Sequence, residues 1–109
     1  MRIDGDLNEI KMIGTLQEAP ELKCNANGTP VTIGRIACRR PRNDGQTEIY
    51  DYFNAVGFDD LARRLAMLPS GARIQIVGRL ANHQFVDRAG NNRTIPQIRI
   101  TALAPMNRD

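Results

Sequence analysis

The sequence predicts a mainly β protein, a five-stranded barrel with one helix between its third and fourth strands. Short segments rich in alternating apolar residues are separated by clusters of Gly, Pro, Asn and Asp, which are typical of turns. One segment after position 58 has apolar residues at helical spacing instead. The chain has 109 residues, enough for one hydrophobic core, so we expect residues 1–109 to form a single domain.

The first strand is predicted over residues 7–16, where Gly14 allows the backbone to bend. Residues 17–29 have a turn-forming composition. This segment ends near Asn27-Gly28, a dipeptide that favours a tight turn before the next strand. We therefore expect an irregular connection between the first two strands.

The second strand is predicted over residues 31–38 and is expected to bury mainly one face. Val31, Ile33 and Ala37 share one parity, although Ile36 on the opposite parity blurs the alternation. Residues 39–46 are predicted to form a loop, because proline, glycine and consecutive charges do not continue a paired strand. The third strand is predicted over residues 48–58, which are rich in aromatic residues and poor in helix formers.

The helix and the last two strands follow. Asp59 or Asp60 is expected to cap the helix, and Pro69-Ser70-Gly71 to end it. Its apolar face consists of Leu61, Ala62, Leu65 and Leu68. A fourth strand is predicted over 74–87, a hairpin turn over 88–92, and a last strand with alternation at Ile98, Ile100 and Ala102. This order of elements is that of the oligonucleotide-binding (OB) fold, although a mixed α+β sandwich would share it.

The charge of the chain indicates a nucleic-acid partner. The formal net charge is +3, and thirteen of the fifteen basic residues are arginine. Arginine binds phosphate through a bidentate fork and stacks on bases, so this composition favours nucleic acid over a merely solvated basic surface. The sequence has no apolar stretch that would span a membrane and no apolar signal region at its N-terminus, so we expect a cytoplasmic protein.

The sequence gives no support for catalysis, for a metal or for a cofactor. Cys24 and Cys38 are the only cysteines, and a zinc site usually needs about four ligands at closer spacings. We expect both to be reduced thiols, buried or half-buried, with a disulfide as the lesser alternative. His83 is expected to be an ordinary strand residue, and no nucleophile or metal partner accompanies Asp59 and Asp60.

Several short motifs occur in a fixed order along nearly the whole chain. They are Ile13-Gly14-Thr15-Leu16 with Pro20-Glu21-Leu22, Asn27-Gly28-Thr29-Pro30-Val31, Ile36-Ala37-Cys38-Arg39-Arg40, Tyr52-Phe53-Asn54-Ala55-Val56, Gly71-Ala72-Arg73-Ile74-Gln75-Ile76-Val77-Gly78-Arg79-Leu80 and Asp87-Arg88-Ala89-Gly90-Asn91. In this order the motifs resemble those of the bacterial single-stranded-DNA-binding proteins. The resemblance implies an OB fold that binds single-stranded DNA without catalysis, in replication, repair or recombination.

The resemblance also implies which residues hold DNA. The stacking positions of the family fall on Tyr52, Phe58 and Phe85, while Pro41 stands where the family has a further aromatic residue. Strand parity places Tyr52, Asn54 and Phe58 on the groove side and Phe53 in the core with Ala55. The candidate backbone contacts are Arg35, Arg39, Arg40, Arg42, Arg79, Arg88, Arg93 and Arg99. Arg39, Arg40 and Arg42 are the strongest of these, because three cations in one loop are able to close over a strand.

Two further function classes share these features. A primosomal accessory protein of the OB type would bind single-stranded DNA together with a helicase or its loader. An OB module that binds only protein or oligosaccharide is the third class. The sequence ends at Pro105-Met106-Asn107-Arg108-Asp109 without the acidic tail of the family, so we expect a truncated or tailless member. The resemblance also implies a homodimer or homotetramer, with replication or primosome proteins as further partners.

Overall fold

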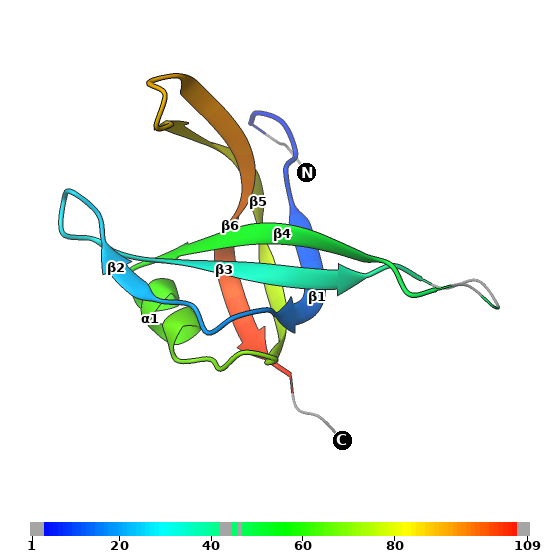
Figure 1. The fold of residues 1–109 in the computed structure, drawn as a ribbon. Helices are drawn as coiled ribbons and strands as arrows, with labels where there is room; N and C mark the ends of the chain where they lie inside the picture. The colour runs from blue at the N-terminus through cyan, green and yellow to red at the C-terminus, as the bar shows by residue number, and fades with distance from the viewer. Residues whose placement is uncertain (1–3, 42–44, 46, 107–109) are drawn as a thin grey trace.

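The computed structural model describes residues 4–41, 45 and 47–106, and its chain folds as a twisted β-barrel with two long arms (Figure 1). Each arm is a two-stranded ribbon. The elements in chain order are β1 (Ile10–Leu16), β2 (Leu22–Cys24), β3 (Pro30–Arg39), β4 (Tyr50–Phe58), α1 (Asp60–Ala66), β5 (Arg73–Val86) and β6 (Asn92–Pro105).

Five of these strands close the predicted barrel. The sheet order is β1-β5-β6-β4-β3-β2, and β1 pairs with β3 through Thr15 opposite Ala37 and Leu16 opposite Ile36, which joins the two sides. All pairings are antiparallel except the short parallel contact between β4 and β6. The helix lies between the third and fourth barrel strands, so the predicted OB-fold order is confirmed.

The structure adds one strand where the sequence predicted only a turn segment. In β2, Leu22 to Cys24 pair with Thr32 to Pro30 along the free edge of β3. All three β2 residues are exposed, and three residues are too few to show alternating burial. The asparagine–glycine turn is confirmed, since Gly28 has a φ of 81° and the Asn25 amide donates to the Thr29 carbonyl at 3.0 Å.

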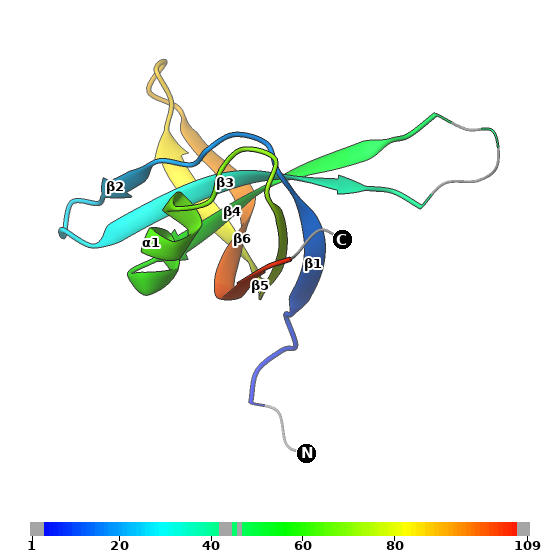
Figure 2. The same cartoon turned by 90° about the horizontal axis from the view of Figure 1, so that it is seen from below.

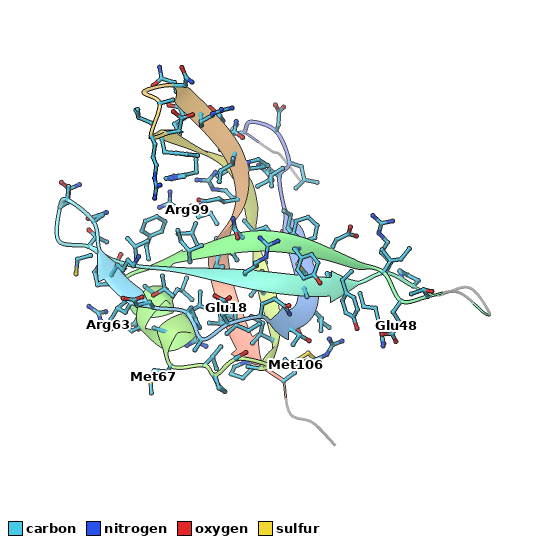
Figure 3. The ribbon with its side chains drawn as sticks, viewed as in Figure 1. Glu18, Glu48, Arg63, Met67, Arg99 and Met106 are labelled. Atoms are coloured by element: carbon cyan, nitrogen blue, oxygen red, sulfur yellow. The ribbon has the colours of Figure 1, made fainter. Side chains whose placement is uncertain are left out.

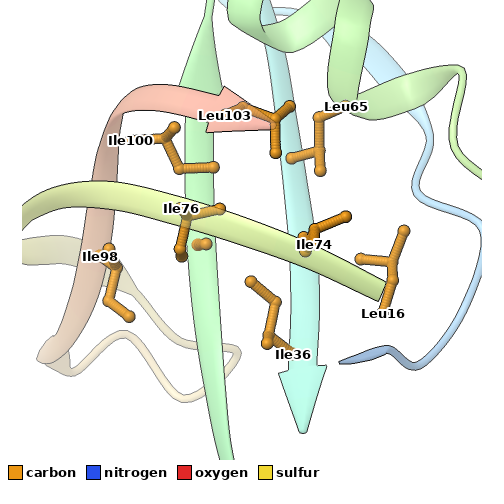
Figure 4. Close-up of a cluster of buried hydrophobic side chains, with 9 residues drawn as sticks. Leu16, Ile36, Leu65, Ile74, Ile76, Ile98, Ile100 and Leu103 are labelled. Atoms are coloured by element: carbon orange, nitrogen blue, oxygen red, sulfur yellow. The ribbon is translucent and has the colours of Figure 1, made fainter. Parts of the chain in front are cut away.

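The core lies between the helix and the inner faces of the barrel strands (Figure 4). Its buried side chains are Leu16, Ile36, Ala55, Leu65, Ile74, Ile76, Ile98, Ile100 and Leu103. The core face of β3 is therefore the one that carries Ile36, and the expectation from Val31 and Ile33 is wrong, because Ile33 is 48% exposed.

The helix packs as predicted but begins differently. Ala62 and Leu65 are buried, and Leu61 and Leu68 pack against the core. Asp59 precedes the helix with a φ of 56°, and its carboxylate makes no capping hydrogen bond. The predicted side-chain cap is therefore wrong, since Asp59 is instead held by its backbone amide, which donates to the Pro30 carbonyl at 3.0 Å.

The two cysteines are free in the structure. Cys38 is half-buried, as expected, and its sulfur lies 3.7 Å from the Ile13 carbonyl oxygen. Cys24 is exposed on the edge strand β2, so its expected burial is wrong. In the described part of the chain, no helix is long and apolar enough to cross a membrane.

The β5–β6 ribbon is longer than the barrel needs. Each strand has 14 residues, and the register shifts between Val77 and Gly78. Beyond this irregularity the ribbon rises out of the barrel and curves beside the β3–β4 ribbon, which extends in another direction (Figures 1 and 2). The turn at its tip is closed by the Asp87 carboxylate, which accepts hydrogen bonds from the amides of Ala89 and Asn91.

Candidate nucleic-acid interface

A groove lies between the β5–β6 arm and the ribbon formed by β3 and β4. Its volume is about 490 Å³ and it is open to solvent at the surface. The residues lining it are Arg35, Tyr52, Phe53, Asn54, Leu80, Ile95, Pro96, Gln97 and Ile98. These residues include a cation and no carboxylate, so the groove suits a ligand that is anionic and partly apolar.

Two arginine–aromatic pairs stand on this side of the sheet. The Arg35 guanidinium carbon lies 5.0 Å from the ring centroid of Tyr52, and that of Arg99 lies 4.5 Å from the centroid of Phe58. Both distances are typical of cation–π contacts. Arg99 projects from β6 into the space between the arm and β4 (Figure 3). In each pair, therefore, a flat aromatic ring and a planar guanidinium are in contact with each other.

Strand register explains why these residues meet. Arg35 is opposite Asn54 in the β3–β4 pairing, and the outward face of β4 carries Tyr52, Asn54 and Phe58 at alternating positions. Tyr52 is 47% exposed, whereas Phe58 is half-buried beneath Arg99. Of the predicted groove-facing set from β4, Tyr52 and Asn54 line the groove, whereas Phe58 lies outside its lining and beneath Arg99.

Arg79 and Arg99 form a like-charge pair on the same surface. They are directly opposite each other in the β5–β6 pairing, and both are exposed. Like charges opposite each other on neighbouring strands are destabilising. Within the described residues, no carboxylate forms an ion pair with Arg35, Arg79 or Arg99. A bound phosphate would relieve this repulsion.

The aromatic and basic residues predicted near the hairpin lie at the tip of the arm. Phe85 is 39% exposed and stacks on His83 with ring centroids 5.7 Å apart. Arg93 is opposite Phe85, but its guanidinium donates to the Asp87 carboxylate at 2.8 Å. This contact, with the turn amides, lowers the pKa of Asp87. Arg93 therefore braces the turn, whereas Arg88 is exposed at the turn itself.

The predicted basic loop is partly neutralised by its own carboxylates. Arg39 pairs with Glu48 at 3.2 Å, and Arg40 donates two hydrogen bonds to Asp51, each of 2.8 Å. The Arg40 contact lowers the pKa of Asp51. Arg42, the third cation of this cluster, lies outside the residues that the structure describes. Arg39 and Arg40 are thus held at the start of the loop and do not stand as uncompensated cations.

Sequence reasoning missed the apolar wall of the groove. Phe53 was predicted in the core but is 40% exposed, because it lies where β4 leaves the barrel and faces the arm. Leu80 and Ile95 come from the first part of the arm and are equally absent from the predicted site. Their signal in the sequence is the length of the last two strands, which exceeds what a small barrel requires.

Comparisons with known proteins identify the family of this chain. Residues 7–106 match the family described as the single-strand binding protein family. A single-stranded DNA-binding protein of Deinococcus radiodurans is 29% identical over 99% of this chain and 37% of its own length. Its counterpart in Thermus thermophilus is 30% identical over 94% of the chain and 38% of its own length.

A protein of the same name from Rhizobium meliloti is 28% identical over 82% of this chain and 55% of its own length. The chain therefore spans a little over a third of the length of the Deinococcus and Thermus relatives and about half of the Rhizobium one. The match to the family covers nearly all of the barrel and both arms. This chain belongs to the single-strand binding protein family.

Proposed function

We propose that this domain binds single-stranded DNA without base preference, as a non-enzymatic protein of replication, repair or recombination. The observation that carries the proposal is the pairing of Arg35 with Tyr52 and of Arg99 with Phe58 beside a groove without carboxylates. Unpaired bases need flat surfaces on which to stack, and the backbone needs cations. Both requirements are met on one face of the barrel.

In this mechanism the bases contact rings and guanidinium planes, and the phosphates contact arginine edges. Stacking on one aromatic residue contributes about 1–3 kcal/mol and tolerates any base, since every base has a π-face. The exposed guanidinium groups of Arg79 and Arg99 supply phosphate contacts beside the rings. Leu80 and Ile95 provide an apolar wall against the sugars and base edges. The free energy of binding therefore depends little on the base sequence of the DNA.

The direct test is fluorescence anisotropy with labelled oligo-dT, a DNA duplex of the same length and an RNA oligonucleotide. We expect tight binding to oligo-dT that strengthens with its length and weakens with salt. A duplex hides the base faces, so it should bind much more weakly. Equal affinity for duplex and oligo-dT, or no binding to either, would contradict the proposal.

The like-charge pair gives a prediction about salt. The double variant Arg79→Ala, Arg99→Ala should bind oligo-dT more weakly, and its slope of log affinity against log salt should be shallower by about 0.7 for each phosphate that the variant no longer neutralises. Arg63→Ala, in helix α1 and outside the lining of the groove, is the control and should leave the slope unchanged. Titrations at several salt concentrations measure this, and identical slopes in all three proteins would exclude Arg79 and Arg99 from phosphate binding.

The proposal includes assembly as a homodimer or homotetramer. Strand β1 carries Ile13, which is 40% exposed on the outer face of the barrel, and β2 leaves a free strand edge. Exposed apolar strand faces and unpaired edges favour pairing with another chain. Light scattering on the purified protein should give the mass of two or four chains, and Ile13→Glu should reduce it. A single-chain mass for the unmodified protein would contradict this part of the proposal.

A further inference from the structure

A second hollow adjoins the groove on the outer face of the sheet. Its volume is about 280 Å³, and it is lined by Thr15, Gln17, Ala37, Tyr50 and Tyr52. Tyr52 lines both hollows, so its exposed ring stands between them. A strand that stacks on Tyr52 from the groove is therefore led directly into the second hollow.

Tyr50 lies in this second hollow in the same way that Tyr52 lies in the groove. The two tyrosines are two positions apart on β4, so their side chains share one face of the strand. Tyr50 is 41% exposed, and Arg39 is directly opposite it in the β3–β4 pairing. Tyr50 beside Arg39 thus repeats the arrangement of Tyr52 and Arg35 two residues farther along the β3–β4 ribbon.

Glu48 distinguishes the surroundings of Tyr50 from those of Tyr52. Its carboxylate accepts a hydrogen bond from the Tyr50 hydroxyl at 3.0 Å and pairs with the Arg39 guanidinium at 3.2 Å. The hydrogen bond raises the pKa of Tyr50, with the charge of Glu48 as the second cause. By contrast, no carboxylate lines the hollow on the Arg35 side of Tyr52. Glu48 therefore occupies the Tyr50 hydroxyl and the Arg39 guanidinium, the two groups that a bound nucleotide would contact.

We propose that Tyr50, Arg39, Gln17 and Thr15 form a further nucleotide subsite, in which a base stacks on Tyr50 and a phosphate displaces Glu48 from Arg39. This inference rests on the proposed function, because the strand reaches the subsite only from the groove across Tyr52. Glu48 sets the affinity of the subsite as a competitor of the phosphate. The ligand is one additional nucleotide of the same single strand.

The expected gain in affinity for oligo-dT follows from the strength of the ion pair between Glu48 and Arg39. An exposed ion pair contributes at most about 1 kcal/mol, so removing it should raise affinity by about two- to fivefold. The variant Glu48→Gln removes the charge and retains the size of the side chain. The gain should appear only with oligonucleotides long enough to pass Tyr52.

The matched control lies on the same ribbon. Asp51 is opposite Cys38 and lines neither hollow. It forms the same kind of ion pair, with Arg40, at 2.8 Å. Asp51→Asn removes one negative charge from the same β3–β4 ribbon, and Asp60→Asn does so in helix α1 beside Arg63. If only the loss of one negative charge mattered, Glu48→Gln and Asp51→Asn would have the same affinity for oligo-dT.

The experiment is an anisotropy titration of the full chain and its variants with oligo-dT of increasing length. We expect Glu48→Gln to bind longer oligonucleotides two- to fivefold more tightly than Asp51→Asn, and Tyr50→Ala to bind them more weakly than the unmodified protein. With the shortest oligonucleotides that bind, Glu48→Gln should equal Asp51→Asn and Tyr50→Ala should equal the unmodified protein. Equal affinities at every length would overturn the subsite while leaving the proposed function intact. Failure of the unmodified protein to bind oligo-dT at all would overturn the proposed function first.

A second measurement reads the subsite directly. The chain has two tyrosines and no tryptophan, so Tyr52→Phe leaves Tyr50 as the only tyrosine emitter. We expect saturating long oligo-dT to quench this emission and short oligo-dT to leave it unchanged, because only the long strand reaches Tyr50. Tyr50→Phe, which leaves Tyr52 as the emitter, should be quenched by both. Unchanged Tyr50 emission at saturation with the long strand would exclude stacking there.

Discussion

Replacing both Tyr52 and Phe58 by alanine is expected to lower the affinity for oligo-dT by about 30-fold or more, from a loss of about 1–3 kcal/mol for each stacking ring. The two rings belong to one face of β4 and each lies beneath an arginine. Their removal therefore takes away the base platforms and also releases Arg35 and Arg99 from the positions that the rings favour. Anisotropy titrations at one fixed salt concentration measure the loss.

The control for this double variant must separate binding from folding, since Phe58 is half-buried. Tyr52→Phe with Phe58→Tyr keeps both rings and should retain most of the affinity. Thermal unfolding of all three proteins shows whether the alanine variant is folded at the temperature of the titration. A folded alanine variant that binds as tightly as the unmodified protein would exclude these rings as stacking platforms.

Gly78→Ala is expected to give the largest loss of stability among single small substitutions, about 1–3 kcal/mol or somewhat more. Gly78 lies at the register shift where β5 leaves the barrel. A Cβ at this position would overlap the Arg99 carbonyl oxygen and lie 3.2 Å from the Ile100 Cα. These neighbours are backbone atoms of β6, so they move only if the strand itself moves.

The same substitution at Gly34 is the matched control. There the nearest atoms to a new Cβ are the ends of two leucine side chains, Leu16 Cδ1 at 3.0 Å and Leu65 Cδ2 at 3.5 Å. Side-chain ends adjust by rotamer changes more easily than a paired strand shifts, so Gly34→Ala should cost less. Urea unfolding with linear extrapolation compares the two free energies. Equal costs would show that the close approach of β5 and β6 does not require glycine.

The Gly78 variant also links stability to the binding surface. Arg79 and Arg99 flank the close contact, one on each strand. A displaced β6 would move Arg99 from its place over Phe58, 4.5 Å from the ring centroid. We therefore expect the folded fraction of Gly78→Ala to bind oligo-dT more weakly than Gly34→Ala does.

Much of the fold was predictable because its signals are local. The alternation in the last strand predicted the burial of Ile98 and Ile100, and the helical spacing of Ala62 and Leu65 predicted the helix face. The same alternation is wrong at Ala102, which is exposed while Leu103 is buried, because the β5–β6 register shift interrupts the pattern. Sequence alone failed at β3, where both faces are apolar and parity cannot say which one is inside. It also failed at Phe53, whose parity is that of the core but whose position lies past the end of the barrel.

The sequence by itself determined the order of the five barrel strands and the helix, the family and the exposure of Tyr52 on β4, since these depend on local periodicity and on short motifs. The tertiary structure alone decided which arginines are available. Arg39, Arg40 and Arg93 are paired with carboxylates, whereas Arg35 and Arg99 lie over rings. The physical reason is that ion pairing and cation–π contact depend on which side chains strand pairing brings within a few ångströms, as in the β3–β4 ribbon for Arg35, Arg39 and Arg40 and between β6 and β4 for Arg99.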